Sequence, residues 1–225
     1  MQKNNLIIQH WSGDLPKWAL LAEESIKKYC ENIGCSYQRI SDSNFIDIKI
    51  NKNIKQTMSL QKMNILSDRW DEYDDVCMLD MDMVATKKCE NIFKYTGIGR
   101  LHKKSMQSKN SSKNGKLWPN LYHQGLPMFF GNCIKFTKKE RKELRSAIDK
   151  EEIFNSFSEQ GAPPNDEILM HHLFYKTDII SSKEVLELPH DRFCDLPEES
   201  HSEASLLHFC GPRKNSIIHY KDRLI

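Results

Sequence analysis

Apolar and polar residues alternate in two different periods over the first forty positions. Residues 6–9 (LIIQ) form a short apolar run that predicts a strand. In residues 18–33 apolar side chains recur every three or four positions, the spacing of one helical face, and Gly34 marks the end of that helix. Residues 35–40 alternate again, which predicts a second strand. The chain therefore begins as strand, helix, strand.

The same order continues through the middle of the chain. Residues 59–70 carry apolar residues on much of one helical face, and residues 76–79 (VCML) form an apolar strand after an acidic turn. Strands that alternate with helices are typical of a mixed, mainly parallel sheet flanked by helices, and 225 residues suit one such unit. We therefore predict a single α/β domain over residues 1–225 with a Rossmann-like sheet.

The second half continues with shorter elements. A charged helix is expected over residues 137–150, with Thr137 as N-cap and Glu140 completing a capping box. Gly161 and the prolines after it break the chain before a buried helix at residues 166–175. The predicted strands of this half are residues 126–130, 134–136 and 206–209.

Residues 103–116 (KKSMQSKNSSKNGK) stand apart in composition. They contain five lysines and no acidic residue, which predicts a loop. Two interpretations are open: a solvated surface excursion, or a basic flap that closes over an anionic ligand.

Composition and charge exclude several classes of protein. The net charge is +2, from 33 basic and 31 acidic residues, so no global field attracts nucleic acid or membrane. The first fourteen residues contain only a three-residue apolar run, too short for a signal peptide or a membrane span. The seven cysteines include no CxxC pair, which favours reduced thiols. We expect a soluble, cytoplasmic protein with no nucleic-acid partner.

Two carboxylates, Asp80 and Asp82, follow the apolar strand at residues 76–79. Burying such a pair is costly without a cation or a hydrogen-bond network, and hard oxygen ligands at a strand end suit Mg²⁺ or Mn²⁺. The pair could hold the metal of a nucleotide-sugar glycosyltransferase. It could instead belong to a haloacid-dehalogenase-type phosphatase, with Asp80 as nucleophile, or it could cap a helix or pair with lysine. The phosphatase is less favoured because its acids normally open the domain and no late GDxxxD motif follows.

Several segments resemble one family. YDDVCMLDMDMVATK resembles the YDxVLYLDxDxxV signature of GT-A-fold glycosyltransferases, particularly the glycogenin- and galactosyltransferase-like group. LLHFCGPRK resembles that group's IIHFxGxxKPW segment, with asparagine where the proline is expected. PPNDEILMHHLFY resembles the DQxxLN helix, and HQGLPMFF lies where the group carries an N-x-G-hydrophobic strand. The resemblance implies a GT-A fold and transfer of a sugar from a nucleotide-sugar, with a UDP-sugar favoured, to a glycan or other hydroxyl acceptor.

The resemblance also implies a metal site and a phosphate site. His208 would be the third ligand of Mn²⁺ or Mg²⁺ beside Asp80 and Asp82; a lone histidine on an apolar strand is otherwise a core residue. Gly211 would let the backbone approach a phosphate, and Lys214 would neutralise a diphosphate oxygen. The alternative for this last segment is a basic surface turn.

The remaining candidates surround the donor. Asp166 and Glu167 begin the helix at residues 166–175, where they either bind sugar hydroxyls or act as a base, or simply complement the helix dipole. Gln9, His10 and Trp11 follow the first strand, where the family's uridine contacts begin.

Lys62 is implied to lie near the nucleotide or sugar, and it could equally be an ordinary exposed lysine. The nucleotide-binding half would span about residues 1–100 and the acceptor half about residues 101–225. A third class of function, a catalytically silent nucleotide-sugar-binding domain, stays open.

Overall fold

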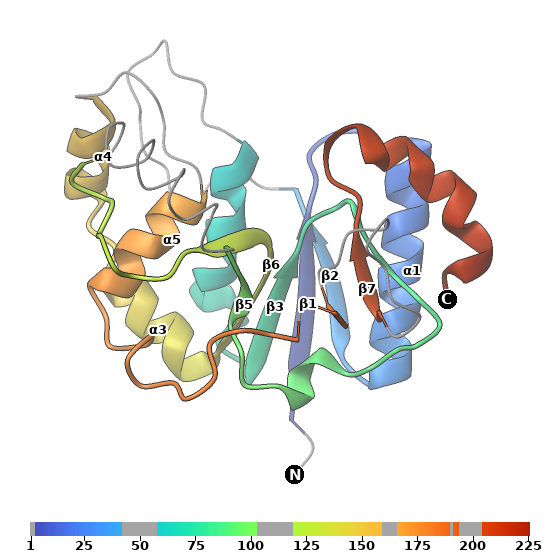
Figure 1. Cartoon of the computed structure of the whole chain (residues 1–225), viewed down its shortest axis with the longest axis horizontal. Helices are drawn as coiled ribbons and strands as arrows, with labels where there is room; N and C mark the ends of the chain where they lie inside the picture. Colours follow the sequence, from blue (N-terminus) through green and yellow to red (C-terminus); the bar gives the residue numbers. More distant parts are fainter. Residues whose placement is uncertain (1–2, 42–57, 103–118, 159–165, 190, 194–203) are drawn as a thin grey trace.

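The computed structural model describes residues 3–41, 58–102, 119–158, 166–189, 191–193 and 204–225. Within these residues the chain forms one five-stranded sheet and a two-stranded sheet (Figure 1). The larger sheet has the order β2 (Ser36–Ile40), β1 (Asn5–His10), β3 (Asp75–Leu79), β6 (Phe129–Thr137) and β5 (Gly99–Leu101).

The larger sheet is parallel on one side and antiparallel on the other. Strand β1 pairs in parallel with both β2 and β3, as strand–helix–strand units require. Strand β6 pairs antiparallel with β3 and with β5. The carboxyl ends of β1 and β3 therefore lie at one edge of the sheet, beside the start of β6.

Alternating side chains of the central strands give the sheet two buried faces. In β1, Leu6 and Ile8 pack into one hydrophobic cluster, whereas Ile7 packs into a second one. In β3, Val76 packs into the first cluster and Cys77 into the second. This period of two explains why the strands of a sheet with both faces covered read as continuous apolar runs.

Helices cover both faces of the sheet (Figure 1). Helix α1 (Lys17–Ile33) and the 3-10 helix η5 (Gly211–Arg223) lie on one side, and α3 (Lys138–Ser146), α4 (Lys150–Ser158) and α5 (Asp166–Tyr175) lie on the other. Short 3-10 helices η1 (Met58–Leu66), η2 (Asp68–Trp70) and η3 (Ile92–Lys94) complete the described elements. No helix among these is long and apolar enough to cross a membrane.

Several boundaries follow from local chemistry that the sequence predicts. Helix α1 ends at Gly34, whose φ of +71° is the left-handed conformation that glycine adopts without strain. Helix α3 begins with the expected capping box: Glu140 N–H donates to Thr137 Oγ1, and Thr137 N–H donates to the Glu140 carboxylate. The predicted single helix over residues 137–150 nevertheless ends at Ser146, and α4 starts separately at Lys150.

Two sequence predictions need correction in detail. Residues 59–70 are helical as predicted, but they form two 3-10 helices, η1 and η2, with Ser67 between them. Residues 126–130 and 134–136 are not two strands, because β6 runs unbroken through Gly131 and Asn132, and Asn132 C=O accepts the Asp80 N–H at 2.8 Å. The predicted basic loop at residues 103–116 lies outside the described residues.

A buried arginine fastens α3 to the segment that precedes β3. Arg141 is fully buried, and its guanidinium donates to the carbonyls of Phe136, Trp70 and Tyr73 at 3.0, 2.9 and 2.7 Å. The planar fork of an arginine can satisfy several carbonyls at once, which a lysine cannot do with the same geometry. This contact fixes the segment that leads into the aspartate pair.

The smaller sheet has a direct consequence for the site. Strand β4 (Met83–Ala85) pairs antiparallel with β7 (Leu206–His208), and Met83 lies opposite His208. In addition, Phe209 N–H donates to the Asp82 carbonyl at 2.9 Å. Two segments that are far apart in the chain are thereby joined at the edge of the larger sheet.

Candidate functional site

The aspartate pair lies in a tight turn at the carboxyl end of β3. Met83 N–H donates to the Asp80 carbonyl at 3.0 Å, so residues 80–83 form a turn between β3 and β4. The Asp80 carbonyl also accepts the side-chain amide of Gln9 at 2.9 Å, from the end of β1. Hydrogen bonds from the two neighbouring strands, β1 and β6, therefore hold the backbone of Asp80 in place.

Asp80, Asp82 and His208 bring three potential ligand atoms together. One atom from each residue lies within 4.8 Å of the others, and this is the only such group of three found among the described residues. His208 Nε2 lies 3.8 Å from Asp80 Oδ2 and 3.2 Å from Asp82 Oδ1. Asp82 Oδ1 is buried, and His208 Nε2 is its polar neighbour; no other donor among the described residues bonds to it. Two carboxylate oxygens and an imidazole nitrogen form a donor set that fits Mn²⁺ or Mg²⁺.

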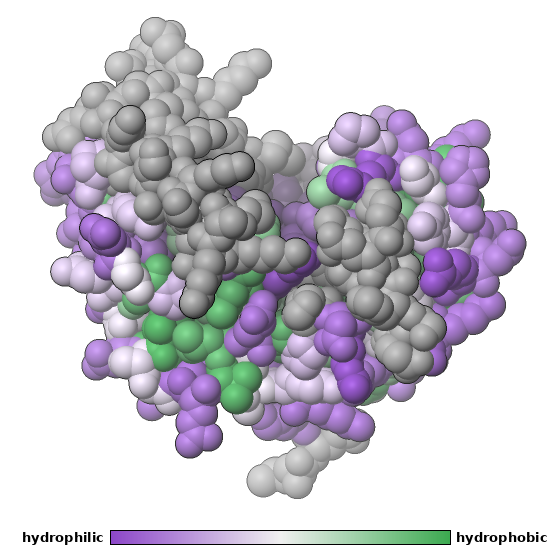
Figure 2. Space-filling model, in the orientation of Figure 1, coloured by the Kyte–Doolittle hydropathy of each residue, from purple (hydrophilic) through white to green (hydrophobic). Residues whose placement is uncertain are grey.

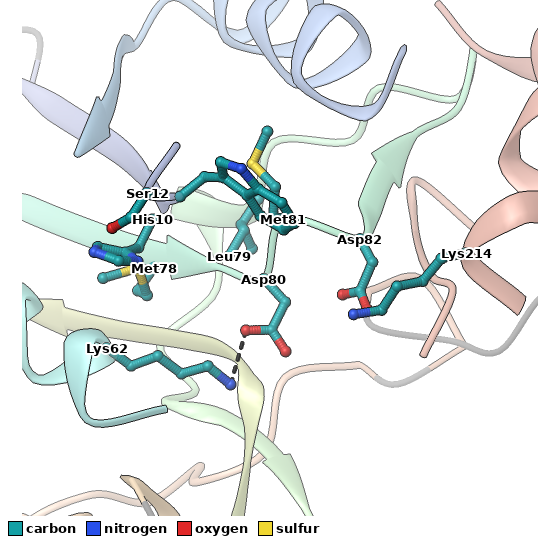
Figure 3. Close-up of a pocket in the computed structure, with 10 residues that line it drawn as sticks. His10, Ser12, Lys62, Met78, Leu79, Asp80, Met81, Asp82 and Lys214 are labelled. Atoms are coloured by element: carbon teal, nitrogen blue, oxygen red, sulfur yellow. Dashed lines mark ion pairs between the residues drawn. The ribbon is translucent and has the colours of Figure 1, made fainter. Parts of the chain in front are cut away.

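Two lysines pair with the carboxylate oxygens of Asp80 and Asp82 that do not face His208. Lys62 Nζ lies 2.7 Å from Asp80 Oδ1, and Lys214 Nζ lies 3.1 Å from Asp82 Oδ2 (Figure 3). Each aspartate thus has one oxygen on a lysine and the other facing His208. Burial acts to raise the pKa of Asp82, but His208 and Lys214 outweigh it and keep that pKa below its usual range.

Lys62 also reaches the start of α5. Its ammonium lies 3.2 Å from Asp166 Oδ2, so it bridges Asp80 and Asp166. Burial acts to lower the pKa of Lys62, yet these two carboxylates raise it above its ordinary value. Burial raises the pKa of Asp166 from 3.8 to about 6, even though Lys62 opposes the change. Carboxyl groups with raised pKa values in clefts are frequent at functional sites.

Glu167 lies beside this bridge and has partners of its own. Its Oε1 accepts the Gly131 N–H at 3.2 Å, and its Oε2 lies 3.4 Å from His102 Nε2. Burial would raise the pKa of Glu167, but His102 and the Gly131 N–H together lower it. The two acids that begin α5 therefore differ: Asp166 has a raised pKa and Glu167 a lowered one.

A pocket of about 370 Å³ opens in front of the aspartates. Its lining combines the end of β1, the turn after β3 and one lysine from each side, as the sticks in Figure 3 show. Trp11 lies on one wall and packs edge-on against Trp18, with ring centroids 5.6 Å apart. Lys214 Nζ lies 5.4 Å from the centroid of the Trp18 ring. The lining residues are His10, Trp11, Ser12, Lys62, Met78, Leu79, Asp80, Met81, Asp82 and Lys214.

Five of the residues predicted for this site do not line the pocket: Gln9, Asp166, Glu167, His208 and Gly211. Asp166 and His208 contact lining residues, and Glu167 follows Asp166 in α5. Gln9 is fully buried: its Nε2 bonds to the Asp80 carbonyl and its Oε1 accepts the Tyr37 hydroxyl at 3.1 Å. Gly211 is exposed at the start of η5 with a φ of +62°, and a Cβ there would meet open space. Gln9 holds the backbone of Asp80 through its Nε2 hydrogen bond, and its neighbours His10 and Trp11 line the pocket.

Gly131 and Asn132 are among the residues that sequence reasoning missed, and both contact predicted residues. A Cβ at Gly131 would come within 2.0 Å of Asp166 Oδ2 and 3.1 Å of Lys62 Nζ, so only glycine allows this approach. Asn132 Nδ2 lies 3.1 Å from His208 Nδ1. Residues 123–125, which the resemblance places at the start of a strand, instead lie in a turn region before β6, and His123 contacts His172. The only sequence signal for Gly131 and Asn132 was that a Gly-Asn pair interrupts an apolar run.

Surface hydropathy differs between the two halves of the molecule in this view. Figure 2 shows mainly hydrophilic residues over α1 and η5 on the right, and a more hydrophobic area on the lower left. On this face, the described surface over α1 and η5 is therefore mainly polar.

Comparison with known proteins places the fold. No protein-family model and no curated protein sequence matches the chain. Among solved structures, a glycosyltransferase involved in the glycosylation of the major capsid of PBCV-1 is similar with a TM-score of 0.58 and 11% identity, over 96% of this chain and 98% of that one. The galactosyltransferase LgtC, solved with donor and acceptor sugar analogues, has a TM-score of 0.58 and 12% identity, over 97% of this chain and 96% of that one. The predicted α/β fold of GT-A type in a single domain is confirmed.

Proposed function

We propose that this protein is a metal-dependent glycosyltransferase that moves a sugar from a nucleotide diphosphate sugar, a UDP-sugar, to a hydroxyl acceptor. The observation that carries the proposal is the group of Asp80, Asp82 and His208 beside a pocket with a lysine on each side. Three donor atoms for a hard cation and two ammonium groups form a site for a pyrophosphate and its metal. The fold shared with two glycosyltransferases agrees with this chemistry.

Asp80, Asp82 and His208 would hold Mn²⁺ or Mg²⁺. When bound, such a cation supplies Lewis-acid stabilisation for the charge that grows on a leaving diphosphate. Lys214, which is part of the pocket lining, can add its positive charge to the diphosphate while still touching Asp82. Trp11 and His10 offer flat surfaces on the side of the pocket where a nucleobase would stack.

Asp166 and Glu167 are proposed to face the sugar. Asp166 is buried beside Lys62, and its raised pKa of about 6 suits a group that exchanges a proton near neutral pH. Glu167 has a lowered pKa and keeps its charge, which suits a hydrogen-bond acceptor for sugar hydroxyls. Lys62 forms an ion pair with both Asp80 and Asp166, so its single positive charge offsets part of the repulsion between the two carboxylates.

In this proposal the two halves of the domain have different roles. Residues of about 1–100 supply the strands β1 and β3 that end at the pocket, and thus the nucleotide side. Residues of about 101–225 supply α5 and, through Asp166 and Glu167, the sugar and acceptor side.

The first experiment measures ligand binding by thermal unfolding. We expect UDP to raise the melting temperature only when Mn²⁺ is present, and Asp82→Asn to abolish this shift while the protein stays folded. Asp71→Asn is the matched control, because Asp71 also pairs with a cation, Arg145 at 2.8 Å, in the segment that follows η2. An Asp82→Asn protein with an unchanged Mn²⁺-dependent shift would contradict ligation by Asp82.

The second experiment separates the three functional classes. A panel of UDP-sugars incubated with Mn²⁺ should give slow release of UDP, as a transferase with water as acceptor does. Hydrolysis of p-nitrophenyl phosphate that depends on Asp80 would support the phosphatase instead. Stabilisation by UDP-sugars without any UDP release, even with sugar acceptors added, would support the silent binding domain.

A further inference from the structure

Asn132 contacts both sides of the proposed metal site. It lies in β6 and is 5% exposed. Its main-chain carbonyl accepts the Asp80 N–H at 2.8 Å, and its side-chain Nδ2 lies 3.1 Å from His208 Nδ1. One residue therefore fixes the backbone of the first aspartate and touches the ring of the histidine.

The hydrogen bond to His208 decides which ring nitrogen carries the proton. A neutral imidazole has one N–H and one lone pair. If Asn132 Nδ2 donates to Nδ1, the proton lies on Nε2, which faces Asp82 Oδ1 at 3.2 Å. A nitrogen that carries a proton has no lone pair for a metal ion, so this form of His208 cannot be a ligand through Nε2.

The amide of Asn132 has a second orientation that removes this conflict. Its Oδ1 is buried, and within the described part of the chain no donor bonds to it. A half-turn of the amide exchanges Oδ1 and Nδ2, so that Oδ1 accepts a proton from Nδ1 and the Nε2 lone pair faces the two aspartates. Either orientation leaves one end of the amide without a partner, so the imidazole decides between them.

We propose that Asn132 is a positioning residue that turns its amide when a cation binds and thereby holds His208 in the ligating tautomer. This inference rests on the proposed metal site. Ligating histidines commonly donate their second N–H to a carbonyl or carboxylate, and loss of that partner weakens metal binding. Asparagine suits both states because its amide can donate to Nδ1 or accept from it, whereas aspartate can only accept and leucine can do neither.

The first test measures Mn²⁺ affinity without nucleotide, from the signal of free Mn²⁺ in electron paramagnetic resonance, above neutral pH. We expect Asn132→Leu to weaken binding about 10–100-fold. Asn132→Asp should restore it, since a carboxylate accepts the Nδ1–H. Asn5→Leu is the matched control: Asn5 is also a buried sheet residue, its Oδ1 has no hydrogen-bond partner among the described residues, and it lies at the opposite end of β1 from the site. The Mn²⁺ affinity of the Asn5→Leu variant should equal that of the wild type.

The second test reads the tautomer directly. Long-range nitrogen–proton NMR of labelled histidine should find the His208 proton on Nε2 without metal and on Nδ1 with Mg²⁺. In Asn132→Asp the proton should lie on Nδ1 in both conditions. This measurement is independent of activity, and it decides the matter on the wild type and Asn132→Asp even if the leucine variant does not fold.

The outcomes separate this inference from the proposed function. Wild-type protein that binds no Mn²⁺ would overturn the metal site and the inference together. Wild-type protein that binds Mn²⁺ while Asn132→Leu binds equally well would overturn the inference alone. A His208 proton that stays on Nε2 in the Mg²⁺-loaded protein would also overturn it.

Discussion

Replacement of Asp166 by asparagine should stabilise the protein in a way that depends on pH. Asp166 is 5% exposed, and burial raises its pKa from 3.8 to about 6. The folded state therefore binds more protons than the unfolded state between these two values, so stability falls as the pH rises through them. The side chain of the Asp166→Asn variant would carry no charge and would escape this loss. It also has nearly the same shape, so the variant should keep the fold.

The magnitude follows from the two pKa values. Their difference, about 6 less 3.8, is about 2.2, and at about 1.4 kcal/mol for each pKa unit the charged carboxylate costs about 3 kcal/mol well above pH 6. The cost is about 1.5 kcal/mol at about pH 5 and about 3 kcal/mol at about pH 8. Lys62 loses one partner in the variant, but it stays protonated throughout this range and so adds only a constant. The pH dependence of the stability difference between the two proteins therefore reports the pKa of Asp166 alone.

The assay is urea unfolding or thermal unfolding of both proteins at several pH values. The stability advantage of Asp166→Asn over the wild type should grow by about 1.5 kcal/mol from about pH 5 to about pH 8, or about 3–6 °C in melting temperature. Asp71→Asn should show no trend in this window, because the pKa of Asp71 lies below 3.8 beside Arg145. A flat difference for Asp166→Asn would refute the reasoning and indicate an ordinary carboxylate.

Two further substitutions test the geometry. Gly131→Ala places a Cβ 2.0 Å from Asp166 Oδ2, so we expect the Asp166 and Lys62 side chains to shift and UDP release from a UDP-sugar to fall about 100-fold, while circular dichroism stays unchanged. Gly125→Ala is the control: its Cβ would meet no described atom within 4 Å, but its φ of +91° disfavours alanine, so we expect it to lose some stability and to keep full UDP release. Equal rates of UDP release for the two variants would contradict the close approach at Gly131. Arg141→Lys should lose about 3 kcal/mol in urea unfolding, because the ammonium of lysine lacks the planar fork with which the guanidinium reaches all three carbonyls. A loss below about 1 kcal/mol would show that water replaces the guanidinium.

Much of the fold was predictable from local sequence chemistry. The periods of two and of about 3.6 predicted β1, α1, β2, β3 and α5, and Gly34 and Thr137 marked helix ends for reasons that the observed caps confirm. Errors occurred where local signals conflicted with pairing. Gly131 and Asn132 look like a turn, yet they continue β6 at the point where its register with β5 shifts, between the Gly99–Ile134 and Leu101–Phe129 pairs.

The candidate site was predictable only in part for the same reason. The aspartate pair was recognisable because two acids after an apolar strand need a partner. Nothing in the local sequence shows that Lys62 bridges Asp80 and Asp166, or that His102 lies beside Glu167. These contacts join segments far apart in the chain, and they form only when the sheet and α5 have packed together.

The sequence by itself determined the alternation of strands and helices and the position of an acidic pair at a strand end, because hydrophobic periodicity and the cost of burying charge are local properties. Only the tertiary structure decided which oxygen of each aspartate faces His208, which lysine holds the other one, and that Asn132 touches the ring of that histidine. Those choices depend on the register between β4 and β7 and between β3 and β6. Register is set by the packing of whole faces, which no short segment of sequence specifies alone.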